Sequence, residues 1–321
     1  MQNCTKSIST AILLSIVATG VVAQQYPSKA VKVYVPYGPG TGVDVAARLI
    51  SEALARNLSQ PFVIENRPGA AGTLATGLVA AAAPDGYSVL VNASSHTSVP
   101  ALMRNLPYDA ARDFAGVTTL AESPLVLVTA KARGLQTVKQ LIAAAKAKPG
   151  SITFASAGVG TATHIAAEKF RLAAGFEALH IPFKSTTDAL ADVTTGRIDY
   201  LYTALVSALG GIRDGRLVAL AMGSRRSSLL PDVPTIVEAG VPNGDYSLWF
   251  GMFVGAKTPR DIVNRLNGET VKLLATPELK DRFAKIGAEP FTMTPEEFDA
   301  MIRREIVENE RLIKAAGIKT E

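Results

Sequence analysis

The sequence predicts an α/β protein built from two successive blocks in which strands and helices alternate. Short β-branched segments are followed by amphipathic helices along most of the chain, and glycine- or proline-rich turns separate them. Units of this kind form mainly parallel sheets covered by helices. The length of 321 residues and the 48% share of hydrophobic side chains suffice for about two domains with sizeable cores.

The first block begins after residue 26. Valine-rich or β-branched runs predict three strands, and apolar residues at helical spacing predict the helices between them. In chain order we expect a strand at 31–35, a helix at 43–58, a strand at 62–65, a helix at 72–83 and a strand at 87–91.

The middle block follows the same order. Proline and glycine end its helices, and a glycine-rich turn precedes its second helix. We expect strands at 125–128, 152–155, 178–182, 198–202 and 217–221, with helices at 138–148, from the turn to 174, and at 188–195.

After residue 231 helices dominate, apart from a strand expected at 249–254. Thr258 and Thr276 each precede a proline, the pattern of a hydroxyl N-cap with proline at the first helical position. Thr294 and Glu297 form a capping box. A helical tail of this kind packs back onto the first block, so we predict a discontinuous first lobe, 24–124 plus 246–321, and a second lobe, 125–245. The chain would cross between them near 123–126 and 243–250.

The N-terminus predicts an exported protein. Lys6 is the only charged side chain before residue 29, and an apolar run at 11–23 ends in small residues. The run is shorter than the roughly 20 residues needed to span a bilayer, so we interpret 1–23 as a signal peptide cleaved after Ala23 rather than a membrane anchor. Cys4, the only cysteine, precedes the apolar run, so the mature periplasmic chain would have no disulfide and no lipid anchor.

The charge distribution does not favour a nucleic-acid partner. The chain has 33 basic and 28 acidic residues, and no block of like charge forms a basic arm. The histidines are His96, His164 and His180, and none has the spacing of a metal motif, so no metal or cofactor is expected.

Two loops of matching design, 36–44 and 156–164, each join a strand to a helix. Their glycines permit a tight turn and a close approach to backbone N–H groups. The helix that follows presents unpaired N–H groups and the positive end of its dipole, an arrangement that binds carboxylate or phosphate. One loop lies in each predicted lobe, so two anionic groups of one ligand could be held across a cleft. The alternative, that both loops are only tight turns with helix caps, stays open.

Other candidate residues also follow strands. Ser94 and Ser95 come after the strand at 87–91 and would donate to a ligand or simply form a turn. Lys184 follows the strand at 178–182 and could pair with a carboxylate, although a surface lysine needs no such role. Asp44 is interpreted as a helix-capping carboxylate, and Trp249 as a residue of either the cleft or the core.

Nucleotide-binding and hydrolase motifs are absent. No P-loop string occurs, and neither glycine loop completes G-x-G-x-x-G. Ser156 is preceded two residues earlier by Phe154 instead of the glycine of a nucleophile elbow. His164 could in principle serve Ser156, but no orienting acid is apparent, so an exported hydrolase is the weaker alternative.

The combination of motifs resembles the Bug family, the extracytoplasmic solute receptors of tripartite tricarboxylate transporters. The matching segments run from about Tyr26 to the C-terminus: VPYGPGTGVD at 35–44, ENRPGAAG at 65–72, APDGY at 83–87, LPYD at 106–109, ASAGVG at 155–160, HIPFK at 180–184, LPDVPT at 230–235 and WFG at 249–251.

The resemblance implies a two-lobed type II periplasmic-binding-protein fold with a Venus-flytrap cleft that binds its ligand without catalysis. It implies a small carboxylate ligand (a dicarboxylate, hydroxy acid or aromatic acid) and membrane transporter subunits as partners. We expect the protein to be a monomer. A periplasmic sensor that signals to a partner would use the same fold. The ligand residues carried over are Tyr37, Gly38, Gly40, Thr41, Ser156, Ala157, Gly158, Gly160 and Thr161.

Two positions depart from the family pattern. Thr203 stands where many members carry an acid, and an acid there would suit a ligand amino group. The resemblance therefore favours a plain carboxylic or hydroxy acid. Thr41 stands where a second glycine is common, and its side chain would narrow the pocket.

Overall fold

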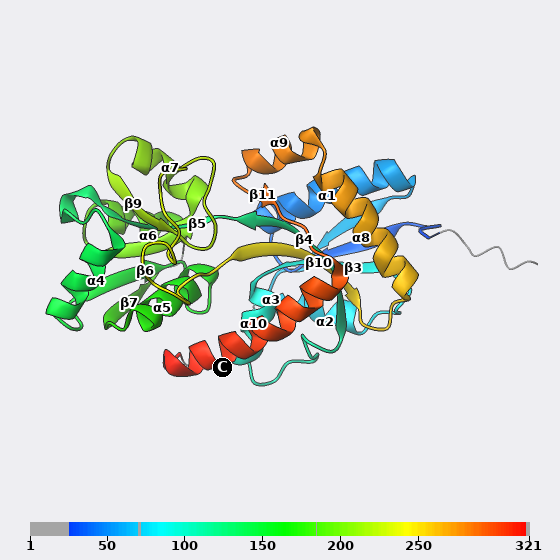
Figure 1. Cartoon of the computed structure of the whole chain (residues 1–321). Coiled ribbons are helices and arrows are strands. Elements are labelled where there is room, and N and C mark those ends of the chain that lie inside the picture. The colour runs from blue at the N-terminus through cyan, green and yellow to red at the C-terminus, as the bar shows by residue number, and fades with distance from the viewer. Residues whose placement is uncertain (1–25, 70–71, 184, 319–321) are drawn as a thin grey trace, which may run out of the picture.

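Two mixed sheets, each covered by helices on both faces, form the two lobes of the molecule (Figure 1). The computed structural model describes residues 26–69, 72–183 and 185–318. The predicted signal peptide, with its cleavage site, and Lys184 lie outside the described residues.

The first sheet has the strand order β11-β4-β10-β3-β1-β2. Its strands are β1 (Val31–Val35), β2 (Phe62–Asn66), β3 (Ser88–Ala93), β4 (Phe114–Ser123), β10 (Leu248–Gly255) and β11 (Glu289–Pro290). β1 pairs in parallel with β2 and β3, as expected of strands that alternate with helices. β10 lies between β3 and β4 and runs antiparallel to both.

Alternation along the strands gives this sheet two apolar faces. In β3, Val89 and Val91 belong to one core and Leu90 to another. Helices α1 (Gly42–Leu58), α8 (Arg260–Leu274) and α9 (Pro277–Lys285) pack on the first face. Helices α2 (Thr73–Ala80) and α10 (Pro295–Ala315) pack on the second face, and α3 (Ser95–Leu102) contacts α10.

The second sheet has the order β7-β6-β8-β5-β9. Its strands are β5 (Leu125–Ala130), β6 (Ile152–Ser156), β7 (Ala178–Pro182), β8 (Tyr200–Ala204) and β9 (Leu217–Met222). β6 is parallel to β7 and β8, while β5 is antiparallel to β8 and β9. Helices α4 (Val138–Ala147) and α5 (Ala162–Ala174) cover one face, and α6 (Thr186–Thr194) and α7 (Leu205–Arg213) the other.

The chain changes sheet at two places. β4 ends at Ser123 and β5 begins at Leu125, so a single residue separates the sheets. The return lies between the end of β9 at Met222 and the start of β10 at Leu248. The domain boundaries at 124/125 and 245/246 themselves stay predictions.

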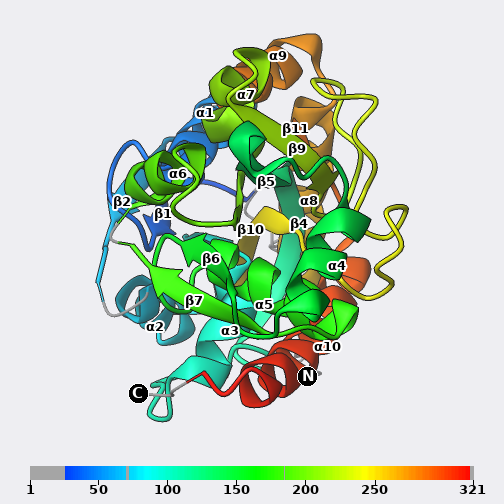
Figure 2. The ribbon, with the colours of Figure 1, turned by 90° about the vertical axis from the view of Figure 1, so that its left-hand side faces the viewer.

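Helix α10 connects the lobes from outside the sheets. It begins on the first sheet, where Phe298 packs against Trp249, and its Ile313 joins the core of the second lobe. With the second lobe facing the viewer, α5 and α10 lie next to each other at the bottom (Figure 2). Among the described residues, no helix combines the length and apolar character needed to cross a bilayer.

One predicted cap is wrong. Helix α8 has Pro259 itself as N-cap, and the buried Thr258 hydroxyl has no hydrogen-bond partner within the described ranges. Thr276 and Thr294 do cap α9 and α10, and the capping box with Glu297 is confirmed.

Candidate ligand-binding site

The two glycine loops have the same hydrogen-bond pattern. In the first, the Gly38 carbonyl accepts from the Thr41 N–H at 3.5 Å and from its hydroxyl at 3.0 Å. In the second, the Gly158 carbonyl accepts from the Thr161 N–H at 3.4 Å and from its hydroxyl at 2.8 Å. Each threonine is the N-cap of the following helix. The match found in the sequence is therefore a match of backbone structure.

Each loop is also held by a side chain from the first turn of its helix. The Gly40 N–H donates to Oδ2 of Asp44 at 2.8 Å, and the Gly160 N–H donates to Nδ1 of His164 at 3.0 Å. Both glycines have positive φ, 84° and 77°, which favours glycine at these positions.

Asp44 lies in the first turn of α1, whose N-cap is Thr41, and its carboxylate accepts the N–H of the preceding Gly40. Burial alone would raise its pKa, but hydrogen bonds from Arg48, Asn66 and the Gly40 N–H outweigh burial and hold the pKa below its ordinary value. Arg48 donates to Oδ2 at 3.0 Å, and Nδ2 of Asn66 donates to Oδ1 at 2.7 Å. The carboxylate is therefore ionised, and Arg48 balances its negative charge, so that the charge does not oppose an anion at the loop.

Both loops leave N–H groups available. The N–H groups of Gly42 and Val43 in α1, and of Ala162 and Thr163 in α5, have no hydrogen-bond partner in the part of the chain that the structure describes. These groups form the positive ends of two helices. The arrangement can bind one anionic group per loop.

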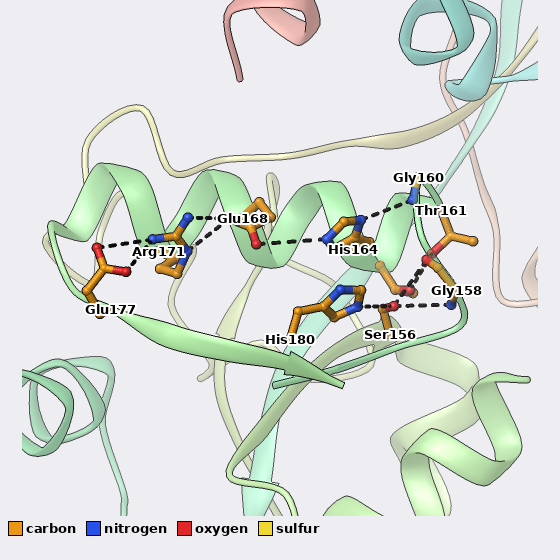
Figure 3. A network of polar contacts seen from close by, with 10 residues as sticks. Ser156, Gly158, Gly160, Thr161, His164, Glu168, Arg171, Glu177 and His180 are labelled. Carbon is orange, nitrogen blue, oxygen red and sulfur yellow. Dashed lines mark hydrogen bonds and ion pairs between the residues drawn. The ribbon is translucent and has the colours of Figure 1, made fainter. Parts of the chain in front are cut away.

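Ser156 is fixed by His180 (Figure 3). The Ser156 hydroxyl lies 2.7 Å from Nε2 of His180, and the ring of His180 stacks on that of His164 with centroids 3.9 Å apart. Burial, followed by the influence of His180 and Arg171, lowers the pKa of His164 to about 3, and burial lowers the pKa of His180 to about 4. Both rings are therefore neutral at pH 7. The histidine that bonds Ser156 is His180, and not His164, which the sequence offered only as a possibility.

The first loop is tied to the start of α3. The Tyr37 hydroxyl lies 2.5 Å from Oγ of Ser95, and its pKa is raised by burial. The Tyr246 hydroxyl, from the segment that returns to the first sheet, reaches Oγ of Ser94 at 3.5 Å. Ser94 is the N-cap of α3. The structure thus brings Tyr37, Ser94 and Ser95 together.

The second loop approaches the same helix from the other lobe. A Cβ atom on Gly160 would lie 2.7 Å from Cδ1 of Leu102, at the C-terminal end of α3. Thr203, in contrast, is fully buried in β8, and its hydroxyl has no hydrogen-bond partner among the described residues. Unpaired buried hydroxyls are uncommon, and this one is not exposed to the surface, so its role as a ligand residue stays a prediction.

A cavity of about 610 Å³ lies away from the glycine loops. It is lined from α5, α10 and the segment before β10, and none of the predicted ligand residues lines it. Within residues 26–69, 72–183 and 185–318, no group of three His, Cys, Asp or Glu side chains is placed to hold a metal ion.

Three residues of this region were not predicted as site residues. His180 and Asn66 occur within the segments that carry the family resemblance, so the signal was present but was not read as a contact. Tyr246 had no sequence signal, because its role depends on where the return segment meets α3.

The sequence matches the family described as "Tripartite tricarboxylate transporter family receptor" over residues 46–318. The chain belongs to this receptor family. Protein BugT of Bordetella pertussis (strain Tohama I) is 34% identical over 306 residues, which cover 94% of each chain. Receptors of this family are periplasmic binding proteins and not enzymes.

Solved structures agree with the fold. The structure titled "R. palustris Rpa4515 with adipate" is 30% identical, has a TM-score of 0.75, and is matched over 92% of this chain and 100% of that one. MatC (Rpa3494) from Rhodopseudomonas palustris with bound malate is 31% identical with a TM-score of 0.72, over 90% of this chain and 100% of that one. The two-lobed binding-protein fold is therefore confirmed.

Proposed function

We propose that this receptor captures a small dicarboxylate between its lobes and delivers it to the membrane subunits of a tripartite tricarboxylate transporter. The observation that carries the proposal is the pair of matched loops, each with free N–H groups at a helix N-terminus. Two such sites, one per lobe, suit a ligand with two carboxylates. The adipate and malate named for the two relatives are ligands of this kind.

The affinity would come from preorganised donors. The side chains of Asp44 and His164 fix the two glycine loops by accepting the N–H groups of Gly40 and Gly160. The free N–H groups of the loops therefore need little rearrangement to receive an anion. The Ser95 hydroxyl lies beside the first loop and is a further donor when Tyr37 donates to it, whereas the buried Ser156 hydroxyl bonds His180 and Gly158 and supports the second loop. Thr203 in place of an acid disfavours a ligand amino group, which makes amino acids the poorer ligand class.

Thermal melting of residues 24–321 against adipate, malate, an aromatic acid and an amino acid tests the ligand class. A ligand present at 100 times its dissociation constant adds about 2.7 kcal/mol to the free energy of unfolding. We expect a dicarboxylate to raise the Tm clearly. We also expect that dicarboxylate to be recovered chemically unchanged afterwards. If no acid raises the Tm, the carboxylate proposal is wrong although the family assignment stands.

Export and the transport role need separate tests. Mass measurement of the protein recovered from the periplasm should show a chain that begins at residue 24. Deletion of the gene should abolish uptake of the labelled acid that raises the Tm. Normal uptake, with loss of a transcriptional or kinase response to the same acid, would instead support the sensor alternative.

A further inference from the structure

Glu305 of α10 belongs to a hydrogen-bond network within the first lobe that joins α10 and β10 to the start of α3. Its Oε2 accepts from the Thr97 hydroxyl at 3.0 Å, and its two oxygens lie 3.2 and 3.1 Å from Nε1 of Trp249. The same side chain lines the cavity of about 610 Å³ between α5 and α10. It is therefore hydrogen-bonded on one side and open to the cavity on the other.

The Thr97 hydroxyl connects Glu305 to the candidate ligand site. Its oxygen also lies 2.8 Å from the carbonyl oxygen of Ser94 and accepts from Nδ2 of Asn309 at 3.0 Å. A hydroxyl has one proton, so Thr97 donates either to Glu305 or to Ser94. When Glu305 is ionised, the proton of Thr97 points to the carboxylate. When Glu305 is protonated, it can donate to Thr97, and Thr97 then donates to Ser94.

The charge of Glu305 bears directly on an anionic ligand. Its carboxylate is two hydrogen bonds from Ser94, whose N–H donates to the Trp249 carbonyl at 3.0 Å and whose hydroxyl receives Tyr246. An ionised carboxylate repels an anion bound near Ser94, and the repulsion is stronger the less water lies between the two charges. Protonation removes that repulsion and at the same time strengthens the hydrogen bonding at the start of α3.

We propose that Glu305 is a proton-binding positioning residue that couples the affinity for the anionic ligand to pH. The coupling to ligand rests on the proposed function, whereas the proton switch itself does not. Because linkage is reciprocal, ligand binding would also favour the protonated form of Glu305.

The surroundings place this equilibrium near neutral pH. Burial raises the pKa of Glu305 to about 7, against the opposing effects of Trp249, Thr97 and Lys169. The charged and titratable groups facing it are Lys169 from α5, Arg304, Glu308 and Arg311 from α10, and Asp245 and Tyr246 from the segment before β10. The three histidines do not titrate near pH 7, because burial lowers the pKa of His96 and His180 to about 4 and that of His164 to about 3.

Trp249 provides a readout without ligand. It is the only tryptophan in the chain, and its indole N–H contacts the Glu305 carboxylate. We expect the fluorescence of the ligand-free protein to titrate with a midpoint near pH 7. Glu305→Gln mimics the protonated acid and should abolish the titration. Glu308→Gln, on the same helix and the same cavity, is the matched control and should keep the titration, with a lower midpoint because the charge of Glu308 raises the pKa of Glu305.

Thr97→Val tests the connection, since it removes a donor that stabilises the carboxylate, and it should move the fluorescence midpoint to higher pH. A fluorescence signal that is flat between pH 5.5 and 8.5, or one that Glu305→Gln leaves intact, overturns the switch. A midpoint unchanged in Thr97→Val overturns the connection through Thr97.

Adipate affinity, measured calorimetrically at pH 6.5 and 8.5, tests the coupling. We expect wild type to bind about fivefold more tightly at pH 6.5, and Glu305→Gln to bind equally at both pH values. Binding by wild type that does not depend on pH overturns the coupling. If adipate binds at neither pH, that result counts against the proposed function, and the Trp249 titration still decides whether the switch exists.

Discussion

Individual buried residues do more here than fill the core. His164 accepts the Gly160 N–H through Nδ1, so that nitrogen must be unprotonated and the ring proton must lie on Nε2. Nε2 is 3.8 Å from a carboxylate oxygen of Glu168. One neutral tautomer of one histidine thus shapes the second glycine loop, and protonation of Nδ1 would remove the acceptor on which Gly160 depends.

The buried histidines predict acid sensitivity. Burial lowers the pKa of all three below the value near 6.5 of an unfolded chain. The unfolded state then binds more protons, so stability is fully present above about pH 6.5 and falls as the pH drops toward 4. Glu305, Glu168 and Asp299 act in the opposite sense because their pKa values are raised, mainly by burial. Among the described residues, five carboxyl groups with lowered pKa values act in the same sense as the histidines: Asp44, Glu52, Glu65, Glu238 and Glu297. Thermal melts between pH 4 and 7 should show a falling Tm, and a constant Tm would contradict neutral burial of the histidines.

Gly160 gives a second prediction at this scale. Alanine there is strained by φ of 77°, and its Cβ would collide with Leu102, whereas Gly134 has φ of 69° and open space around it. We expect Gly134→Ala to cost about 1 kcal/mol of stability, and Gly160→Ala about 1 kcal/mol more. Chemical denaturation measures both. Leu102→Ala combined with Gly160→Ala should recover the excess; if the double variant shows no such coupling, the two lobes do not touch here in solution.

At the scale of elements, helices and strands with regular apolar spacing could be predicted from the sequence, and those without it could not. The strand at 31–35, the helix at 43–58 and the αβ units after 138 were predicted to within a few residues because their apolar spacing is clear. Several elements gave no such signal, among them β4, α3 and α7. Strand β4 is buried along its whole length and so lacks alternation, α3 contains Pro100, and α7 contains two adjacent glycines.

The candidate site shows the same division. The two loops could be predicted because a strand, glycines and a helix start are contiguous in sequence. The contacts of Ser156 with His180, Tyr246 with Ser94 and Glu305 with Thr97 join segments far apart in the chain. Such contacts depend on packing between elements, which residue spacing does not encode.

The caps provide a test of elements that look alike in sequence. Thr258 and Thr294 both precede a proline, but only the Thr294 hydroxyl accepts a backbone N–H, that of Glu297 at 3.2 Å. Valine keeps the shape of threonine and removes the hydroxyl. We expect Thr294→Val to lower the free energy of unfolding by about 1 kcal/mol. Thr258→Val should leave stability unchanged or raise it, because its buried hydroxyl is unpaired. Equal losses in both variants would mean that Thr258 also caps its helix.

At the scale of the whole molecule, the lobes are joined by more than two chain crossings. Buried Glu122 of β4 accepts from Arg225 at 2.7 Å and also from Ser224, and the Ser227 hydroxyl donates to Glu289 of β11 at 3.2 Å. These contacts tie the segment after β9 to the far edge of the first sheet. Together with α10 they join the lobes beyond the two crossings, and we expect any closure to be a rotation of the lobes about this junction.

The last prediction follows from this geometry and from the two loops. A ligand that engages one loop in each lobe gains both contacts only when the lobes approach, so it shifts the population toward a closed form. Small-angle X-ray scattering should therefore show a smaller radius of gyration when saturating adipate is added. A diamine of similar length is the matched control, because helix N-termini repel cations and it should leave the profile unchanged. Superimposable profiles with and without bound adipate would mean that the ligand occupies one lobe alone, and the role assigned to the second loop would then be wrong.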